Sequence, residues 1–279
     1  MKIALRDDDT CFYTKPEELK KAFEGLNIPI SLSVVPFAVF SHAGTYPYGP
    51  ESVETVERYA DVGENSSLIE YIKKGIEYGH FEVSLHGVHH EYFAGQAKEW
   101  IPETEFYDLE WLLTNIGFSR EHLESIFGVH IQTFIAPSNA VSNACAMALD
   151  ELGMDTNSTI NKHFTRNVSA PYLRNYIFSN IFRMVHGTRL CLPQQYKGHM
   201  ELASFDFENE DVILRQYESC QKHNQPLVIY THYWDLLQSP EKKKQLISFI
   251  NRAVQDGAEP VFLSKCFETR SHCCKEKRE

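Results

Sequence analysis

Short apolar runs alternate with amphipathic stretches along most of the 279 residues. The apolar runs are rich in Ile, Val, Leu and Phe and have the length of strands, which is typical of strands buried on both faces. They predict strands within residues 2–8, 28–37, 80–87, 131–138, 226–234 and 259–265. The intervening stretches carry apolar residues at helical spacing and predict helices within residues 14–26, 67–79, 103–127, 139–154, 210–223 and 239–257.

This alternation predicts an α/β fold built on a mostly parallel sheet whose outer faces are covered by helices. No Gly-, Ser- or Pro-rich linker divides the chain, so we expect one domain over residues 1–268 and a polar, disordered tail over residues 269–279. Residues 160–207 show no sustained period. Residues 41–65 are rich in Gly, Pro and Tyr, and a connection of that length is typical of a binding loop or lid.

The first predicted helix carries recognisable start signals. Thr14 stands where an N-cap is expected, Pro16 follows early in the helix, and Glu17 stands where a capping box has its acidic member. We therefore expect this helix to begin directly after Thr14.

Charge, hydropathy and cysteine usage limit the classes of function. The net charge is −11 at pH 7, so a nucleic-acid-binding surface, which relies on Lys and Arg, is not expected. No stretch reaches the roughly 18 apolar residues that cross a bilayer, and no export signal is apparent. The seven cysteines are an odd number without CxxC pairs, which suits a reduced compartment. Together these features predict a cytoplasmic protein without membrane insertion.

Side chains that can bind metal follow three of the predicted strands. The first strand ends in "RDDDT", the third in "SLHGVHH" and a late one in "IYTHYWD". The C-terminal ends of parallel strands meet at one edge of a sheet, so we expect these clusters to lie together. A solvated turn, a surface patch or a core histidine would explain each cluster alone, but their shared position favours one site.

The chemistry of the three clusters is complementary. His86 and His90 stand four residues apart, so on a helical turn they face one side and can bind one ion. A carboxylate from residues 7–9 would complete a set of two histidines and one aspartate. A second carboxylate can accept a proton from water, and His232 can protonate a leaving group. The clusters thus predict metal-assisted hydrolysis of an amide or ester.

These motifs resemble those of the polysaccharide deacetylase family, the NodB-homology group or carbohydrate esterase family 4. The first family motif, typically "VALTFDDGP", lies over "IALRDDDTC" without a gap. The resemblance implies that Asp8 is the catalytic base and Asp9 a metal ligand, with Asp7 in place of a phenylalanine. A slip of one residue, with Asp7 as base and Asp8 as ligand, remains open.

Two further motifs extend the resemblance from residue 3 to about residue 266. The family's "GHEIGSHTxxH" resembles "GHFEVSLHGVHH" with one extra residue, which implies His86 and His90 as metal ligands and His89 as a bystander or supporting group. The family's "LxH" resembles "YTH", which implies His232 as catalytic acid and Tyr230 beside the acetyl pocket. The family implies a single-domain, distorted (β/α) barrel, often of seven strands, and a divalent metal that is commonly Zn²⁺.

Two other family motifs are altered. The third, "RxPYG", appears as "IAPSN", with Ile135 where the family has an arginine that orients the base. We expect Arg6 or Arg183 to supply that charge instead. The fourth, an aspartate–tryptophan element, has no convincing match, and its candidate members are Asp206, Trp234 and Asp235.

The resemblance implies a metal-dependent hydrolase that removes an acetyl group from an N-acetylated sugar. A cytoplasmic setting favours a small carbohydrate or saccharide precursor as substrate. The other readings are an esterase or amidase of the same fold acting on another acylated substrate, and a catalytically inactive carbohydrate-binding homologue. Residues suited either to line the substrate pocket or simply to pack the rim of the barrel are Tyr46, Tyr48, Pro50 and Trp100.

Overall fold

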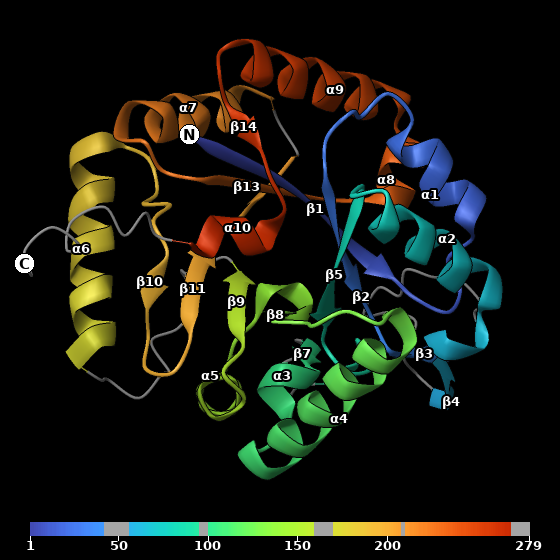
Figure 1. Ribbon diagram of the computed structural model, residues 1–279. Helices are drawn as coiled ribbons and strands as arrows, with labels where there is room; N and C mark the ends of the chain where they lie inside the picture. The colour runs from blue at the N-terminus through green and yellow to red at the C-terminus, as the bar shows by residue number, and fades with distance from the viewer. Residues whose placement is uncertain (42–55, 95–99, 159–169, 208–209, 269–279) are drawn as a thin grey trace, which may run out of the picture.

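A curled sheet of mostly parallel strands occupies the centre of the molecule, and helices surround it (Figure 1). The computed structural model describes all residues except 42–55, 95–99, 159–169, 208–209 and 269–279. The longer strands of the sheet are β1 (Lys2–Thr10), β2 (Ile30–Val34), β5 (Phe81–His86), β8 (Thr133–Ile135), β9 (Asp155–Ser158), β11 (Met200–Ala203) and β13 (Leu227–His232).

Neighbouring strands follow the order β11-β9-β8-β5-β2-β1-β13, and every one of these pairs is parallel. Two-residue strands extend the sheet: β10 (Gln194–Gln195), β12 (Phe205–Asp206) and β14 (Glu259–Pro260). The order confirms the predicted α/β fold with a distorted barrel, and the seven longer strands form the barrel wall.

One short stretch of chain joins the two edges of the curled sheet. β11 pairs with β9, while β12 pairs with β13 on the opposite edge. Ser204 alone separates β11 from β12. The chain therefore passes directly from one side of the curled sheet to the other at Ser204, although β11 and β12 do not pair with each other.

The outer layer consists of α1 (Pro16–Phe23), α2 (Ser66–Glu77), α4 (Leu109–Phe127), α5 (Asn143–Leu152), α6 (Ala170–His186), α7 (Glu210–His223) and α9 (Pro240–Gln255). Shorter helices are α3 (Glu103–Phe106), α8 (Tyr233–Gln238) and α10 (Leu263–Phe267). Two separate strand pairs are β3 (Phe37–Ser41) with β4 (Val56–Asp61) and β6 (Tyr92–Ala94) with β7 (Trp100–Pro102). No described helix is long and apolar enough to cross a membrane.

Strand alternation divides the interior into two apolar clusters. Ile3 and Leu5 of β1 belong to the large cluster between sheet and helices. Ala4 and Val228 belong to a smaller cluster with Leu263 of α10, which fills one end of the barrel. Further along β1 the inward positions become polar, so the opposite end of the barrel holds charged side chains.

Helix α1 begins one residue later than predicted. Lys15 is its N-cap, and the backbone N–H of Lys15 donates to Glu18 Oε2 at 3.4 Å. Thr14 is engaged elsewhere, because its hydroxyl accepts from the N–H of Cys11 at 3.0 Å and lies 3.1 Å from the hydroxyl of Tyr233. The prediction of Thr14 as cap and Glu17 as its partner is therefore wrong.

The stretch 160–207, which shows no period in the sequence, contains the 17-residue helix α6. Its apolar side chains do not form a buried stripe. Those that are exposed are Leu173, Tyr176, Ile177, Phe178, Ile181, Met184 and Val185. The predicted pocket residues Tyr46, Tyr48 and Pro50, and the predicted tail 269–279, lie outside the described residues. The domain boundary at residue 268 stays a prediction.

Candidate metal centre and active site

A bulge at the end of β1 turns two successive carboxylates into the barrel. Asp8 pairs with His232 across the β1–β13 ladder, and the ladder with β2 shifts its register between Asp7 and Thr10. Asp9 has a φ of 73°, in the left-handed region. A regular strand would send Asp8 and Asp9 to opposite faces, whereas the bulge brings both toward the same cluster of histidines.

Three of the predicted site residues converge at this end of the barrel. Asp9 Oδ1 lies 3.2 Å from Nε2 of His86 and 3.2 Å from Nε2 of His90. The three side chains are buried, and their ligand atoms lie within 4.8 Å of one another. His86 ends β5 and is oriented by a second contact, 3.1 Å between its Nδ1 and the carbonyl oxygen of Ile135.

The donor chemistry of this trio fits a divalent metal. When Nδ1 of His86 donates to the Ile135 carbonyl, the Nε2 lone pair faces the Asp9 carboxylate, as in histidines that bind metal. Burial lowers the pKa of His90 to about 4, so that ring is neutral at physiological pH. A divalent cation held between these two nitrogens and the carboxylate would satisfy all three groups, and two nitrogens with one oxygen suit zinc.

The pKa shifts of Asp9 and His86 also favour a bound cation. Burial alone would raise the pKa of Asp9, but the neighbouring imidazoles of His90 and His86 outweigh it and hold that pKa low. Burial also opposes protonation of His86, yet the carboxylates of Asp9 and Asp8 raise its pKa. The site thus attracts positive charge, which a metal would satisfy.

Asp8 is held by a buried arginine. Arg6 is fully buried, and its Nη2 donates to Asp8 Oδ2 at 2.6 Å. The same guanidinium donates to the side-chain oxygens of Asn157 at 2.6 Å and Asn139 at 3.3 Å. Burial opposes ionisation of Asp8, but Arg6 and the nearby histidines outweigh it and lower the pKa of Asp8. An ionised carboxylate fixed in this way is suited to accept a proton.

The two arginines predicted as replacements for the family arginine have different positions. Arg6 contacts Asp8, while Arg183 lies on α6 and donates to Asn180 at 3.3 Å. Arg6 therefore provides the positive charge that Ile135 cannot.

Asp7 faces away from the histidines. It pairs in register with Leu32, which belongs to the outer cluster, and it is fully buried. No side chain among the described residues donates a hydrogen bond to its carboxylate, and the backbone of Tyr233 offers only a weak contact. Burial and the charges of Asp8 and Asp9 raise the pKa of Asp7 well above the usual range. This placement favours Asp8 and Asp9, and not the slipped pair, as the functional carboxylates.

His232 lies at the rim on the far side of Asp9. Its Nε2 is 3.7 Å from Asp9 Oδ2, and its side chain is 24% exposed, so substrate can reach it. Trp234 donates to the same Asp9 oxygen at 3.3 Å, and its ring lies 4.9 Å from the His232 ring. The two aspartates considered beside it, Asp206 and Asp235, both pair with Lys242.

A buried glutamate fixes the loop between the two ligand histidines. Glu103 accepts from the backbone N–H groups of Val88 at 2.6 Å, His89 at 2.9 Å and Glu91 at 3.5 Å. Gly87 in this loop has a φ of 60°, and a Cβ there would lie 2.3 Å from Glu103 Oε1. Glu103 therefore sets the course of the backbone that carries His90.

Near this loop, His89, Glu91 and Glu103 form a second group with metal-ligand spacing. The side-chain atoms of this group that could bind a metal already make hydrogen bonds or stacking contacts within the protein. Glu91 accepts from the hydroxyls of Tyr107 at 2.7 Å and Tyr59 at 3.0 Å, and the His89 ring stacks on Tyr59 at 3.7 Å. This group is a hydrogen-bonded support for the loop, and His89 is turned away from Asp9 into it.

Three supporting residues were not identified from the sequence. A role for Asn139 could have been predicted, because this residue lies in the altered third motif "IAPSN". Asn157 and Glu103 gave no signal, since each acts on residues far away along the chain. Trp100, proposed as a pocket wall, begins β7.

No model of a protein family matches the chain, and no curated protein matches it. Solved structures do. A protein from Mycobacterium smegmatis assigned as a polysaccharide deacetylase aligns with a TM-score of 0.57 and 13% identity over 94% of this chain and 88% of its own. A mutant of a carbohydrate esterase family 4 pseudoenzyme from Bacillus anthracis, with restored activity, aligns with a TM-score of 0.51 and 10% identity over 96% of this chain and 67% of its own. The resemblance inferred from the motifs is thus confirmed at the level of the fold: the chain has the NodB-like barrel of the family 4 polysaccharide deacetylases.

Proposed function

We propose that the chain is a metal-dependent hydrolase that removes an acetyl group from an N-acetylated sugar or small saccharide precursor. One observation carries the proposal: Asp9 lies 3.2 Å from both His86 and His90, while Asp8 and His232 stand beside it on paired strands. The shared fold supports the proposal, but the site residues are its basis. A cytoplasmic location and the absence of nucleic-acid partners stay predictions.

In this proposal Asp9, His86 and His90 hold the metal, most simply Zn²⁺. A divalent metal bound there supplies a Lewis acid that polarises an acyl carbonyl and eases the ionisation of water. Asp8, kept ionised by Arg6, accepts the proton of the attacking water. His232 delivers a proton to the departing nitrogen, so the products are acetate and the free amine.

A second candidate is a catalytically inactive carbohydrate-binding homologue, because one protein of the same fold is described as a pseudoenzyme. The presence of Asp8 and His232 on paired strands beside Asp9 argues against it, since a binding module does not need both a base and an acid. An esterase of the same fold would use the same residues on an oxygen leaving group.

The test combines metal content and acetate release on the same purified samples. Wild type is expected to hold about one equivalent of metal and to release acetate from small N-acetylated sugars. Metal without acetate, combined with turnover of O-acetyl esters, would favour the esterase. Metal with no turnover of either substrate class would favour the binding homologue. A protein that takes up no metal after addition of zinc would refute the mechanism.

A further inference from the structure

A cavity of about 560 Å³ lies between α6, β12 and α7. Three arginines line it: Arg183, Arg189 and Arg215. Within the described part of the chain, none of the three forms an ion pair. Unpaired positive charge gathered in a cavity is unusual for a protein with a net charge of −11, and it provides a field that attracts anions.

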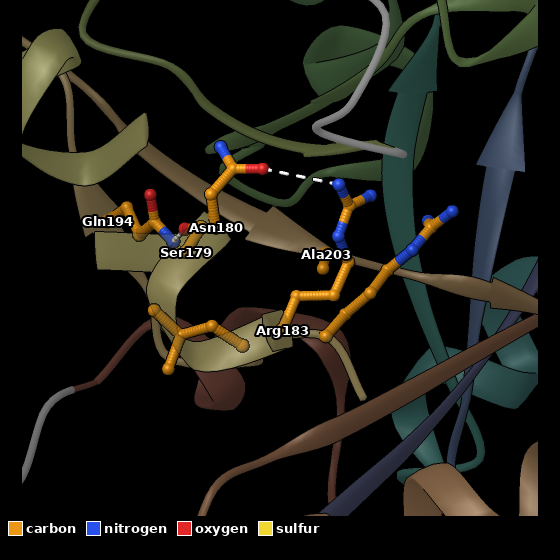
Figure 2. Close-up of a pocket in the computed structure, with 7 residues that line it drawn as sticks. Ser179, Asn180, Arg183, Gln194 and Ala203 are labelled. Atoms are coloured by element: carbon orange, nitrogen blue, oxygen red, sulfur yellow. Dashed lines mark hydrogen bonds between the residues drawn. The ribbon is translucent and has the colours of Figure 1, made fainter. Parts of the chain in front are cut away.

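The arginines are held by contacts that leave their charge uncompensated. Arg183 Nη2 donates to Asn180 Oδ1 at 3.3 Å, and Figure 2 shows both side chains at the wall of the adjoining small pocket. The guanidinium of Arg189 lies 5.8 Å from the centroid of the Phe205 ring. The acidic lining residue, Asp206, lies 3.9 Å from Lys242, which also pairs with Asp235, so three arginines face one carboxylate that is partly compensated.

The positive region continues past Arg215. An adjoining cavity of about 420 Å³ is lined by the basic or imidazole side chains of Arg215, Lys222, His186 and His223, together with one carboxylate, Glu218. Desolvation, together with the neighbouring His186 and Lys222, lowers the pKa of His223. The basic side chains of this second cavity extend the positive surface beyond the first.

The cavity shares a wall with the candidate active site. Ser204 and Tyr230 both line the cavity. Ser204 Oγ lies 3.4 Å from Arg6 Nη1, and the Arg6 guanidinium lies 4.8 Å from the centroid of the Tyr230 ring. Arg6 in turn holds Asp8. A single layer of side chains thus separates the arginine cavity from the carboxylate expected to activate water.

We propose that this cavity binds an oxyanion of the substrate, a phosphate or a carboxylate, so that the acylated saccharide is anionic and not neutral. The inference rests on the proposed function and adds its substrate class. Guanidinium groups recognise both oxyanions through paired N–H donors, and an arginine without a carboxylate partner has those donors available. The ring of Tyr230, which lines the cavity, lies 6.2 Å from the ring of His232 at the rim of the candidate site, so a saccharide that crosses Tyr230 would reach both the arginines and the active site.

The binding test is titration of inorganic phosphate into full-length, zinc-loaded protein by calorimetry. We compare wild type with the double variant Arg189→Gln/Arg215→Gln. The matched control is Arg174→Gln, an exposed arginine on α6 that does not line the cavity. Loss of two charged contacts is expected to weaken phosphate binding about tenfold or more, while the control is unchanged. Equal phosphate affinity in all three proteins would overturn the proposal.

The activity test measures acetate release from N-acetylglucosamine, its 1-phosphate and an N-acetylated amino-uronic acid. Wild type is expected to have a KM at least about tenfold lower for one anionic sugar, and the double variant is expected to lose this advantage with kcat retained. The preferred sugar identifies the anion as phosphate or carboxylate. Phosphate binding without any KM advantage would mean an adventitious ion only. Arginine-dependent phosphate binding with no acetate from any sugar would refute the proposed deacetylation and leave the anion site standing.

Discussion

Arg6 and Asp8 form a buried ion pair inside the barrel, with Nη2 of the arginine 2.6 Å from Oδ2 of the aspartate. Both lie on β1, two residues apart, so the strand itself places them on one face. Asn157 holds the other end of the guanidinium from the opposite side of the barrel. The charge that the altered motif at Ile135 lacks is therefore supplied within the strand that carries the carboxylate.

Replacing Arg6 should damage both stability and turnover. Arg6→Gln leaves the buried Asp8 carboxylate without its counter-charge, which is expected to destabilise the protein by about 3 kcal/mol. Because Asp8 is no longer held, kcat should fall while metal content stays near wild type. Denaturant unfolding, acetate release and elemental analysis measure the three quantities. Arg174→Gln, with the same change of charge on an exposed site, should alter none of them, and an unchanged kcat in Arg6→Gln would contradict the assignment.

Mutation of Asp8 and mutation of Asp9 should have different effects on metal content and turnover. Asp9→Asn is expected to lose metal, because the amide offers a weaker and uncharged ligand next to His86 and His90. Asp8→Asn is expected to retain metal and lose at least about a hundredfold in kcat, the usual contribution of a general base. Metal content and kcat on the same samples provide the comparison. The reverse result, metal lost in Asp8→Asn and kept in Asp9→Asn, would assign the carboxylates the other way.

Among the three clustered histidines, His89 should be dispensable for metal. His86→Ala and His90→Ala each remove a nitrogen 3.2 Å from Asp9 and are expected to abolish stoichiometric metal. His89→Gln removes a ring that stacks on Tyr59, so it should retain metal with a modest loss of thermal stability. Elemental analysis, with circular dichroism to establish folding, decides the case. A His89→Gln protein free of metal would show that the ligand assignment is wrong.

Glu103 should act through the loop that it holds. Glu103→Gln keeps the size of the side chain but turns an NH₂ group toward backbone N–H groups that now donate to a carboxylate. Zinc affinity is expected to fall about 10- to 100-fold, as for other groups that orient metal ligands. Competition with a chelator measures it. Glu105→Gln, an exposed neighbour on α3, is the matched control, and equal zinc affinity in both variants would refute the role.

Asp7 should make stability depend on pH. Its pKa in the folded protein is raised above the ordinary value of 3.8, so the folded state binds a proton that the unfolded state releases. The associated stability is present below about pH 4 and is lost as the pH rises toward the folded pKa, at about 1.4 kcal/mol per pH unit. Asp7→Asn removes this loss, so in metal-free protein its gain in Tm over wild type should be larger at pH 8 than at pH 5.

The control for this pH effect is Glu110→Gln, which removes an exposed carboxylate on α4. Its difference in Tm from wild type should stay the same across the two pH values. A gain in Asp7→Asn that is equally independent of pH would mean that the Asp7 side chain does not carry a raised pKa.

Much of the candidate site could be predicted from the sequence, because it follows from where strands end and from the alternation of side chains along a strand. Strand ends at one edge of a parallel sheet explain why Asp8, His86 and His232 meet, and alternation along β1 explains why Arg6 accompanies Asp8. The left-handed turn at Asp9 was not accessible, because an aspartate gives no clear signal for positive φ.

The missed features depend on contacts that no local pattern encodes. Asn157 reaches Arg6 across 151 positions of sequence, and Glu103 reaches a loop that precedes it by more than ten residues. Helix α6 was missed for a different reason: periodicity finds helices through their buried stripe, and the apolar side chains of α6 are largely exposed.

The position of β1 between β2 and β13 has a consequence for the order in which a growing chain acquires its chemistry. The proposed metal ligands all lie within residues 9–90, on β1 and at or just after the end of β5, and these two strands sit on either side of β2. His232 arrives only when β13 pairs with the open edge of β1. During synthesis, in which the N-terminal part emerges first, the proposed ligand set is complete before the proposed catalytic acid has been made. A ribosome-bound or C-terminally truncated chain would thus carry the means to bind metal without the means to complete hydrolysis.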